Sequence, residues 1–297
     1  MKILVIVVTY NAMEWIDRCF GSVYNSSIPV DLYAVDNGST DGTQHYILSN
    51  YPNVIFYQSR NNLGFGKANN IGIKYALENN YNYVYLLNQD AWIEEDTIEQ
   101  IISIQKRHIE YGILSPFQMQ SDMFHIDENF IKNVCSYDSN QDLFNDLYQA
   151  KAKEIYQVTN VMASHWLLSI DCIKKVGGFS PTFPHYGEDD NYIDRAIFHG
   201  FRIGITPSLQ VVHDRGKRIE TKKMQIYKYY IWQLHLLSKI TTSSYTFTKM
   251  VTIMLAGVLR FKSLIPLIYL GRVLLSYHKI QKNRDLSKCQ GAFLSLN

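Results

Sequence analysis

Short apolar runs alternate with segments of helical spacing along the first half of the chain. The runs are continuous, as expected for strands that are buried on both faces of a sheet. Strands are predicted at residues 3–8, 32–35, 54–57 and 83–87. Helices are predicted at 12–25, 41–48, 66–78 and 94–108, with Thr40 or Asp41 as the N-cap of the second. This order predicts an α/β fold in which a mostly parallel sheet carries helices on both faces.

The pattern is less regular in the second half. Residues 116–157 are polar and aromatic without a clear period, and they are predicted to form an insertion over a ligand-binding cleft at the edge of the sheet. Further strands are expected within 158–170 and at 202–205 and 209–213, and a helix at 192–199.

Charge divides the chain into two regions. The net charge of the 297 residues is +2, but from residue 215 onward the balance is +13 and before it −11. The sequence therefore predicts an acidic domain at 1–215 and a basic helical tail at 216–297. A basic tail seeks an anionic partner, and nucleic acid and a membrane surface are the usual candidates.

The tail has an amphipathic pattern. Residues 250–259 and 263–271 are uncharged, but Arg260 and Lys262 separate them, which argues against a membrane-spanning helix. Polar and small residues recur at helical spacing, namely Lys249, Thr252, Ala256, Arg260 and Ser263. Such helices either lie in a membrane surface or pack on the domain at 1–215. Nucleic-acid binding would leave the apolar side unexplained, so a membrane surface is the expected partner, with no nucleic acid.

Two further features bear on location. The four cysteines, Cys19, Cys135, Cys172 and Cys289, are scattered, which fits a reducing compartment and argues against a disulfide framework or a cysteine zinc site. The apolar start resembles a first strand more than a signal peptide, because no small-residue cleavage site follows it. We expect a cytoplasmic protein, peripheral on the inner face of the cell membrane. A monomer and an oligomer both stay open.

Polar loops follow four of the predicted strands, at 9–11, 36–39, 61–67 and 88–90. Ordinary strand-to-helix turns use the same residue types. In parallel sheets, however, ligands bind at the carboxyl ends of the strands, so four polar loops at one edge predict a binding cleft. The loop from 61 is neither a Walker loop nor a dinucleotide fingerprint, although its backbone N–H groups could hold a phosphate.

Several side chains in these loops could carry chemistry. Asp90 can hold a hard divalent cation through oxygen, with His213 as a second ligand. Asp36 can accept hydrogen bonds from a base or ribose, and Tyr10 offers a face for stacking. Each could instead be a turn or loop residue.

The acidic segment 184–192 follows the turn Gly177-Gly178-Phe179. A carboxylate at a helix start can take a proton from a hydroxyl if it points into a cleft. A solvated helix start explains one or two of these acids, but it explains less well their place after the turn and the His185-Tyr186 pair.

The ordered set of motifs resembles the family 2 glycosyltransferases, and is most similar to their rhamnosyltransferase-like branch of bacterial polysaccharide assembly. The resemblance covers residues 2–215. The motifs are Thr9-Tyr10-Asn11, Val35-Asp36-Asn37-Gly38-Ser39, 61–70, Leu87-Asn88-Gln89-Asp90, Gly177-Gly178-Phe179 and Gly187-Glu188-Asp189.

The resemblance implies a GT-A fold, a nucleotide-sugar donor, a divalent metal (Mn²⁺ or Mg²⁺) and inversion at the anomeric carbon. It also implies that 1–215 is the catalytic domain and that the insertion at 116–157 covers the acceptor side of the cleft. It places Asp189 on the catalytic base with Glu188 beside it, and Asp90 and His213 on the metal site. Asn88 stands where the family's DxD motif has its first Asp, and Asn191 where the family has a second acid.

The resemblance also implies which residues bind the two substrates. The donor-binding set is Thr9, Tyr10, Asn11, Asp36, Asn37, Asn61, Gly66, Lys67, Asn70, Asn88 and Gln89. A glycan or lipid-linked glycan acceptor is expected to contact His165, Trp166, His185 and Tyr186. The alternatives are a nucleotidyltransferase on a related sheet, whose triphosphate-gripping loop after the first strand is not seen, and a non-catalytic binding protein with a basic tail.

Overall fold

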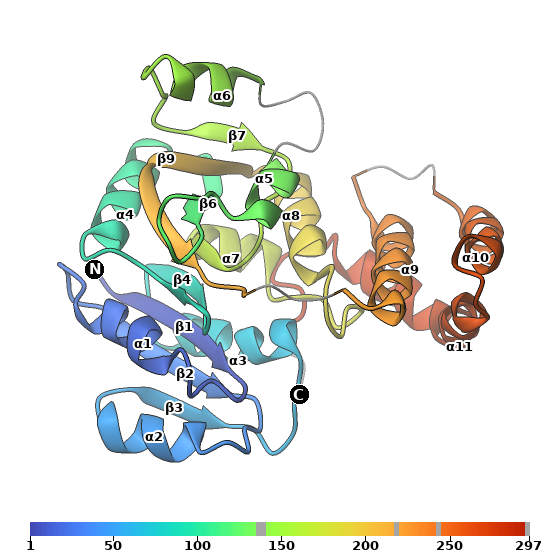
Figure 1. Ribbon diagram of the computed structural model, residues 1–297, viewed down its shortest axis with the longest axis horizontal. Helices are drawn as coiled ribbons and strands as arrows, with labels where there is room; N and C mark the ends of the chain where they lie inside the picture. Colours follow the sequence, from blue (N-terminus) through green and yellow to red (C-terminus); the bar gives the residue numbers. More distant parts are fainter. Residues whose placement is uncertain (135–140, 217–219, 242–244, 295–297) are drawn as a thin grey trace.

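A computed structural model describes residues 1–134, 141–216, 220–241 and 245–294 of the chain (Figure 1). Its centre is a nine-stranded sheet in the order β3-β2-β1-β4-β8-β6-β9-β5, with β7 paired to β9. The strands are β1 (Ile3–Thr9), β2 (Asp31–Asp36), β3 (Ile55–Gln58), β4 (Tyr83–Asn88), β5 (Ala91–Trp92), β6 (Tyr111–Met119), β7 (Tyr156–Val158), β8 (His165–Ser169) and β9 (Arg202–His213). The first four are mutually parallel, and β8 runs antiparallel to both of its neighbours.

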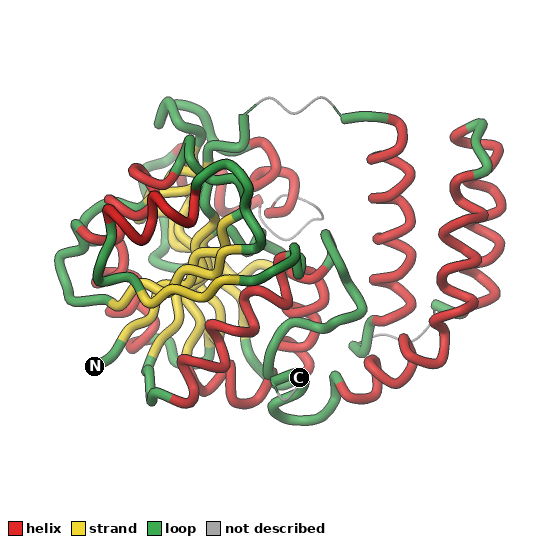
Figure 2. The backbone as a smooth tube through the Cα atoms, turned by 90° about the horizontal axis from the view of Figure 1, so that it is seen from below, coloured by secondary structure: helices red, strands yellow, loops and turns green. Residues whose placement is uncertain are grey.

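Helices cover both faces of this sheet and bury two separate cores. One core packs α1 (Ile16–Tyr24), α2 (Thr43–Asn50) and α4 (Thr97–Arg107) against the sheet. The other packs α3 (Phe65–Glu78), α7 (Ile170–Val176) and α8 (Glu188–Phe198) against the opposite face. Figure 2 shows the strands between these helix layers. The predicted α/β architecture is confirmed, with the first four strands and helices close to their expected places.

Two predictions for the second half are wrong in detail. Residues 116–119 belong to the fully buried strand β6 and not to an insertion; Pro116 is tolerated where the pairing with β9 shifts its register. The two strands expected at 202–205 and 209–213 form the single strand β9. The region 158–170 holds the strand β8, as expected, and α7 follows it, with Ser169 as its N-cap accepting a hydrogen bond from Cys172 N at 3.2 Å.

Between β6 and β7 the chain forms two short helices, α5 (Glu128–Val134) and α6 (Gln141–Tyr148).

Of the four cysteines, Cys19 and Cys172 are buried free thiols and Cys289 is exposed, whereas Cys135 lies outside the described residues.

The tail forms three helices that stand beside the sheet in both views, α9 (Lys222–Ser238), α10 (Phe247–Phe261) and α11 (Ile265–Leu286) (Figures 1 and 2). They enclose a third apolar core, which Phe183 from the catalytic body joins. Among the helices that the structure describes, none combines the length and apolar character that crossing a bilayer requires.

Candidate active site

Asp36 organises the loop after β2. Its side chain is fully buried, and its carboxylate accepts hydrogen bonds from six donors. These are Thr9 Oγ1 (3.1 Å), Gly38 N (3.1 Å), Ser39 N (2.9 Å), Ser39 Oγ (2.5 Å), Gln44 Nε2 (3.1 Å) and Gln58 Nε2 (2.9 Å). A carboxylate with this many partners is held in one orientation, so Asp36 fixes the ends of β1 and β2 relative to each other.

Neighbouring loops are tied to the same edge of the sheet. Asn37 accepts a hydrogen bond from Leu63 N at 2.8 Å, which draws the loop before α3 toward β2. Asn11 N donates to Ser39 Oγ at 2.9 Å. Tyr10 N donates to Gln89 Oε1 at 2.7 Å, while the Tyr10 ring is 46% exposed. The predicted loops therefore meet at one edge, and the Tyr10 ring is accessible there. Asn61 and Lys67 are exposed.

Asp90 and His213 meet where β5 pairs with β9. Asp90 Oδ1 is 3.5 Å from His213 Nε2, and both side chains are largely buried. Asn88 Nδ2 lies 3.4 Å from the same histidine nitrogen. The antiparallel pairing of Ala91 with His213 explains the meeting, because it brings residues more than 120 positions apart into register.

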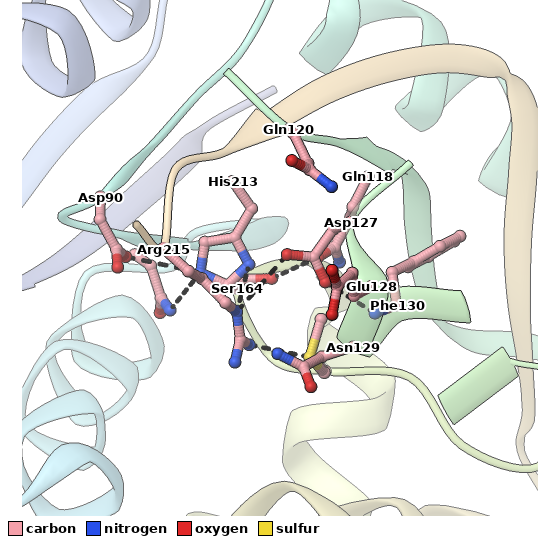
Figure 3. A network of polar contacts seen from close by, with 12 residues as sticks. Asp90, Gln118, Gln120, Asp127, Glu128, Asn129, Phe130, Ser164, His213 and Arg215 are labelled. Atoms are coloured by element: carbon pink, nitrogen blue, oxygen red, sulfur yellow. Dashed lines mark hydrogen bonds and ion pairs between the residues drawn. The ribbon is translucent and has the colours of Figure 1, made fainter. Parts of the chain in front are cut away.

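Arg215 extends this contact toward α5 (Figure 3). Its Nε donates to His213 Nδ1 at 3.3 Å and lies 3.7 Å from Asp127 Oδ2. Asp127 is itself buried and accepts a hydrogen bond from Phe130 N at 2.7 Å in the first turn of α5. A single guanidinium thus joins the Asp90–His213 pair to the segment between β6 and β7.

Three acids occupy the first turn of α8. Glu188 is 6% exposed, and within the described part of the chain its Oε2 has no hydrogen-bond partner. Asp190 accepts a hydrogen bond from Asn160 Nδ2 at 2.7 Å, and its N–H donates to Asp189 Oδ1 at 3.0 Å. In the sequence of this turn, Asp189 therefore lies between the buried Glu188 and the hydrogen-bonded Asp190. An unpaired buried carboxylate oxygen beside it is unusual outside functional sites.

Burial dominates the electrostatics of these acids. It raises the pKa of Asp189 to about 7; the charge of Asp190 acts in the same direction, and Arg215 acts against it. Burial, followed by the charge of Asp189, also raises the pKa of Glu188. The carboxyl group of Asp189 is therefore poised to gain or lose a proton near neutral pH, which suits a general base.

A family model described as glycosyl transferase family 2 matches residues 4–155, just over half of the chain. The chain belongs to glycosyl transferase family 2. The family match favours the glycosyltransferase over the nucleotidyltransferase and the binding protein considered above.

Relatives of this family 2 chain carry glycosyltransferase names. Glycosyltransferase GlyA of Streptococcus pneumoniae serotype 4 is 29% identical over 164 residues, which are 50% of this chain but only 22% of that protein. An N-acetylglucosaminyl-diphospho-decaprenol L-rhamnosyltransferase of Mycobacterium tuberculosis is 25% identical over 232 residues, covering 71% of this chain and 76% of that protein.

A solved structure has the same fold. Mannosyltransferase PcManGT from Pyrobaculum calidifontis, in complex with GDP-Man and Mn²⁺, matches with a TM-score of 0.59 at 16% identity. The match covers 96% of this chain and 84% of that chain. The expected GT-A fold of this family 2 protein is confirmed.

The Asp90–His213 pair fits part of a divalent-metal site. Ligand bonds of about 2.0–2.6 Å place two neighbouring ligands about 3 Å apart around one ion, close to the observed 3.5 Å. No cluster of three or more His, Cys, Asp or Glu side chains suited to a metal occurs in the described ranges. The remaining ligands would have to come from a bound diphosphate and water.

Two predicted acceptor contacts are wrong. His165 and Trp166 lie on β8 and are completely buried. His165 Nε2 lies 2.8 Å from Val212 O, and its Nδ1 lies 3.1 Å from Tyr85 OH, so both ring nitrogens are used inside the protein. Burial lowers the pKa of His165 to about 3, which keeps the ring neutral. The Trp166 ring packs on Phe179 at 6.3 Å. Both residues build the core behind the site.

Asn70 and Gly66 lie against the turn Gly177-Gly178-Phe179. Asn70 Oδ1 accepts a hydrogen bond from Phe179 N at 2.6 Å, and its Nδ2 donates to Phe179 O at 2.9 Å, so its whole amide group holds the Gly-Gly-Phe turn. This placement corrects the expectation that Asn70 faces the donor. Gly66 is buried, and a Cβ there would come within 2.9 Å of Phe179 Cβ. Close packing of α3 against this turn explains the glycine.

The predicted residues His185 and Tyr186 stay near the acids, His185 exposed and Tyr186 half-buried. Sequence reasoning did not assign Arg215, Asp127 or Asn160 to the site. Their only sequence signals are an arginine two positions after His213 and polar residues in a region without a clear pattern, and both signals are common in loops.

Proposed function

We propose that this chain is a metal-assisted inverting glycosyltransferase of cell-surface polysaccharide assembly. It moves a sugar from a nucleotide-diphosphate donor to a hydroxyl of a glycan or lipid-linked glycan acceptor. The observation that carries the proposal is the presence of two sites near Arg215: the Asp90–His213 pair, to which Arg215 donates a hydrogen bond, and the partly buried Asp189, whose ionised form the charge of Arg215 favours.

Each site has one task in the proposed reaction. Asp90 and His213 hold a divalent ion, which when bound neutralises the departing nucleoside diphosphate. Asp189 accepts the proton of the acceptor hydroxyl as its oxygen attacks the anomeric carbon on the face opposite the diphosphate. Direct displacement of this kind inverts the configuration, and it needs one base and no covalent sugar–protein intermediate.

The donor loops supply recognition in this proposal. The exposed Tyr10 ring stacks on the base, and the loop ordered by Asp36 contacts base and ribose. PcManGT was solved with GDP-Man, and the mycobacterial relative is named for an acceptor that carries a diphospho-decaprenol. These names support a sugar nucleotide as donor and a lipid-linked glycan as acceptor.

A donor panel tests the proposal. Purified protein is incubated with UDP-, dTDP- and GDP-linked sugars, with and without Mn²⁺ or Mg²⁺, and release of each nucleoside diphosphate is measured. We expect metal-dependent release from one donor class and a loss of about a hundredfold or more in Asp90→Ala, because charge stabilisation of the leaving group is a large part of catalysis. Equal release by Asp90→Ala and wild type would contradict the metal role of Asp90.

The reaction rate is expected to fall as the pH drops through about 7. Burial raises the pKa of Asp189 to about 7, and only the ionised carboxylate can accept a proton. Protonation below that pH therefore removes the base, whereas an ordinary aspartate would stay ionised down to about pH 4. A profile of kcat against pH, measured between pH 5 and 9, checks this. A rate that is constant down to pH 5 would mean that Asp189 titrates as a normal aspartate or is not the base.

We also propose that the tail docks on the inner surface of the cell membrane. The helices α10 and α11 and the turn between them expose large apolar side chains: Leu255, Leu259, Leu264, Leu267, Ile268, Leu274 and Leu275. Exposed basic residues accompany them, namely Lys249, Arg260, Lys262, Arg272 and Lys279. Apolar groups with surrounding cations suit the boundary of an anionic bilayer. The protein would bind a lipid-linked acceptor at that surface.

The double variant Leu259→Glu/Leu275→Glu is expected to weaken binding to vesicles of phosphatidylcholine and phosphatidylglycerol by about tenfold or more. The two leucines are 81% and 92% exposed, and burying each in lipid contributes about 1.5–3 kcal/mol. Co-sedimentation with the vesicles measures the bound fraction. Leu48→Glu, at a 55% exposed leucine on α2, is the matched control. Equal sedimentation of wild type and the double variant would exclude docking through α10 and α11.

A further inference from the structure

The tail helix α9 contacts the segment that leads into the three acids. Tyr227 OH donates a hydrogen bond to the backbone oxygen of His185 at 2.8 Å. The Tyr227 ring lies 6.4 Å from the Tyr186 ring, and Lys228 Nζ lies 5.7 Å from the centre of that ring. Burial raises the pKa of the Tyr227 hydroxyl to about 12, and the charges of Tyr230 and Glu188 act in the same direction. The tail therefore contacts the segment immediately before the three acids.

The backbone of this segment adopts two consecutive left-handed conformations. Tyr186 has φ +64° and Gly187 has φ +81°, and α8 begins at Glu188 immediately afterwards. The left-handed region costs a residue with a side chain about 1–3 kcal/mol, so surrounding contacts must maintain it at Tyr186. This turn sets the direction in which α8 begins and therefore where Asp189 lies.

Contacts from α9 hold the turn at Tyr186 and Gly187 in place. A Cβ on Gly187 would come within 2.8 Å of Ile231 Cγ2, one helical turn after Tyr227, so α9 packs directly on the backbone of the turn. Phe183, on the other side of the turn, is buried in the same apolar core as Ile231. The hydrogen bond from Tyr227 adds a directional contact that fixes the orientation of the His185 carbonyl.

We infer that Tyr227 is a positioning residue for the transfer reaction, acting through the backbone of His185 to hold the turn that presents Asp189. The inference rests on the proposed function, in which Asp189 is the base. It makes α9 part of the catalytic unit, although the charge pattern divides the chain before this helix. Tyr227 touches neither substrate nor metal in this role, and its effect is on the placement of Asp189.

The variant Tyr227→Phe tests the inference, with Tyr229→Phe as its matched control. Tyr229 lies on the same helix and makes the same kind of bond, donating from its hydroxyl to Ile253 O at 2.9 Å, but within the tail. We expect Tyr227→Phe to lower kcat for release of UDP, dTDP or GDP from the sugar nucleotides by about tenfold to a hundredfold, since small misplacements of a catalytic group cost that much. The KM for the donor should stay within about twofold, because the donor loops are untouched. Tyr229→Phe should change neither constant.

Hydrogen exchange gives a readout that does not depend on turnover. In Tyr227→Phe, amides of a peptide spanning residues 183–191 should exchange faster, including Asn191 N, which donates to Gly187 O at 3.0 Å. In Tyr229→Phe that peptide should exchange as in wild type.

Two results would overturn the inference: unchanged exchange in Tyr227→Phe, or an equal loss of kcat in both variants, which would indicate a general loss of tail stability. Measuring Asp189→Asn in the same assay separates this inference from the proposed function. If Asp189→Asn is as active as wild type, the proposed base is wrong. If Asp189→Asn loses activity but Tyr227→Phe is fully active, Asp189 remains the base and the positioning role of Tyr227 is wrong.

Discussion

Asp189→Asn is expected to lower kcat by a factor of about 10²–10⁴, the usual contribution of a positioned general base. The amide has the same shape as the carboxyl group but cannot accept the acceptor's proton. Because burial already disfavours the ionised form of Asp189, removing its charge should leave stability unchanged or slightly increase it. Initial rates from the donor panel, with thermal unfolding of both proteins, measure the two effects.

The neighbouring Asp190→Asn is the matched control for that substitution. Asp190 lies in the same turn, but it already accepts a hydrogen bond from Asn160 and is therefore less suited to take up a proton. We expect it to keep kcat within about tenfold, since it alters the field around Asp189 without removing the base. If Asp190→Asn lost more activity than Asp189→Asn, the two roles would have to be exchanged.

Gly177→Ala is expected to destabilise the protein by about 3 kcal/mol or more, combining backbone strain with overpacking. Gly177 has φ +85°, and a Cβ there would overlap the backbone of Ala292. The next residue, Gly178, donates its N–H to Ala292 O at 2.8 Å, so neither segment can move aside without losing that bond. Thermal unfolding should show a Tm lower by roughly 5 °C or more.

Gly271→Ala in α11 is the control for Gly177→Ala. Nothing lies within 4 Å of its Cβ position, and alanine is the better helix former by about 1 kcal/mol. Its Tm should be equal to or above that of wild type. A similar loss of Tm in both variants would show that the close approach of Ala292 to Gly177 is not what makes the glycine necessary.

The first four strands could be predicted because each is a short apolar run bounded by polar turns, and this local pattern is sufficient for a parallel sheet. The same pattern located the loops that meet at the carboxyl edge. The roles of Asp90, His213 and Asp189 could be predicted only from the ordered set of motifs. Single residues of these types are common in turns and do not indicate a role by themselves.

The errors arose where distant contacts decide the structure. His165 is polar and was expected at a surface, but Tyr85 OH and Val212 O satisfy both of its ring nitrogens inside the sheet. The resemblance places Asn70 on the donor, but Phe179 N and O use its whole amide group. The insertion is expected to begin at residue 116, but a register shift keeps Pro116 within β6. No local pattern encodes these partners, and the raised pKa of Asp189 likewise depends on burial by segments far away in the sequence.

The strand order also determines when the two halves of the site can assemble. β1 to β4 all lie within the first 88 residues and pair with one another, so the donor half can fold while later residues are still being synthesised. The other half must wait for β9, which pairs with β6 about ninety residues earlier and brings His213 to β5. Pairing over such separations is slow, because the loop must close before any contact is gained. Asp90 therefore meets His213 only after the last strand is in place, and a partly folded chain does not yet have the proposed metal pair.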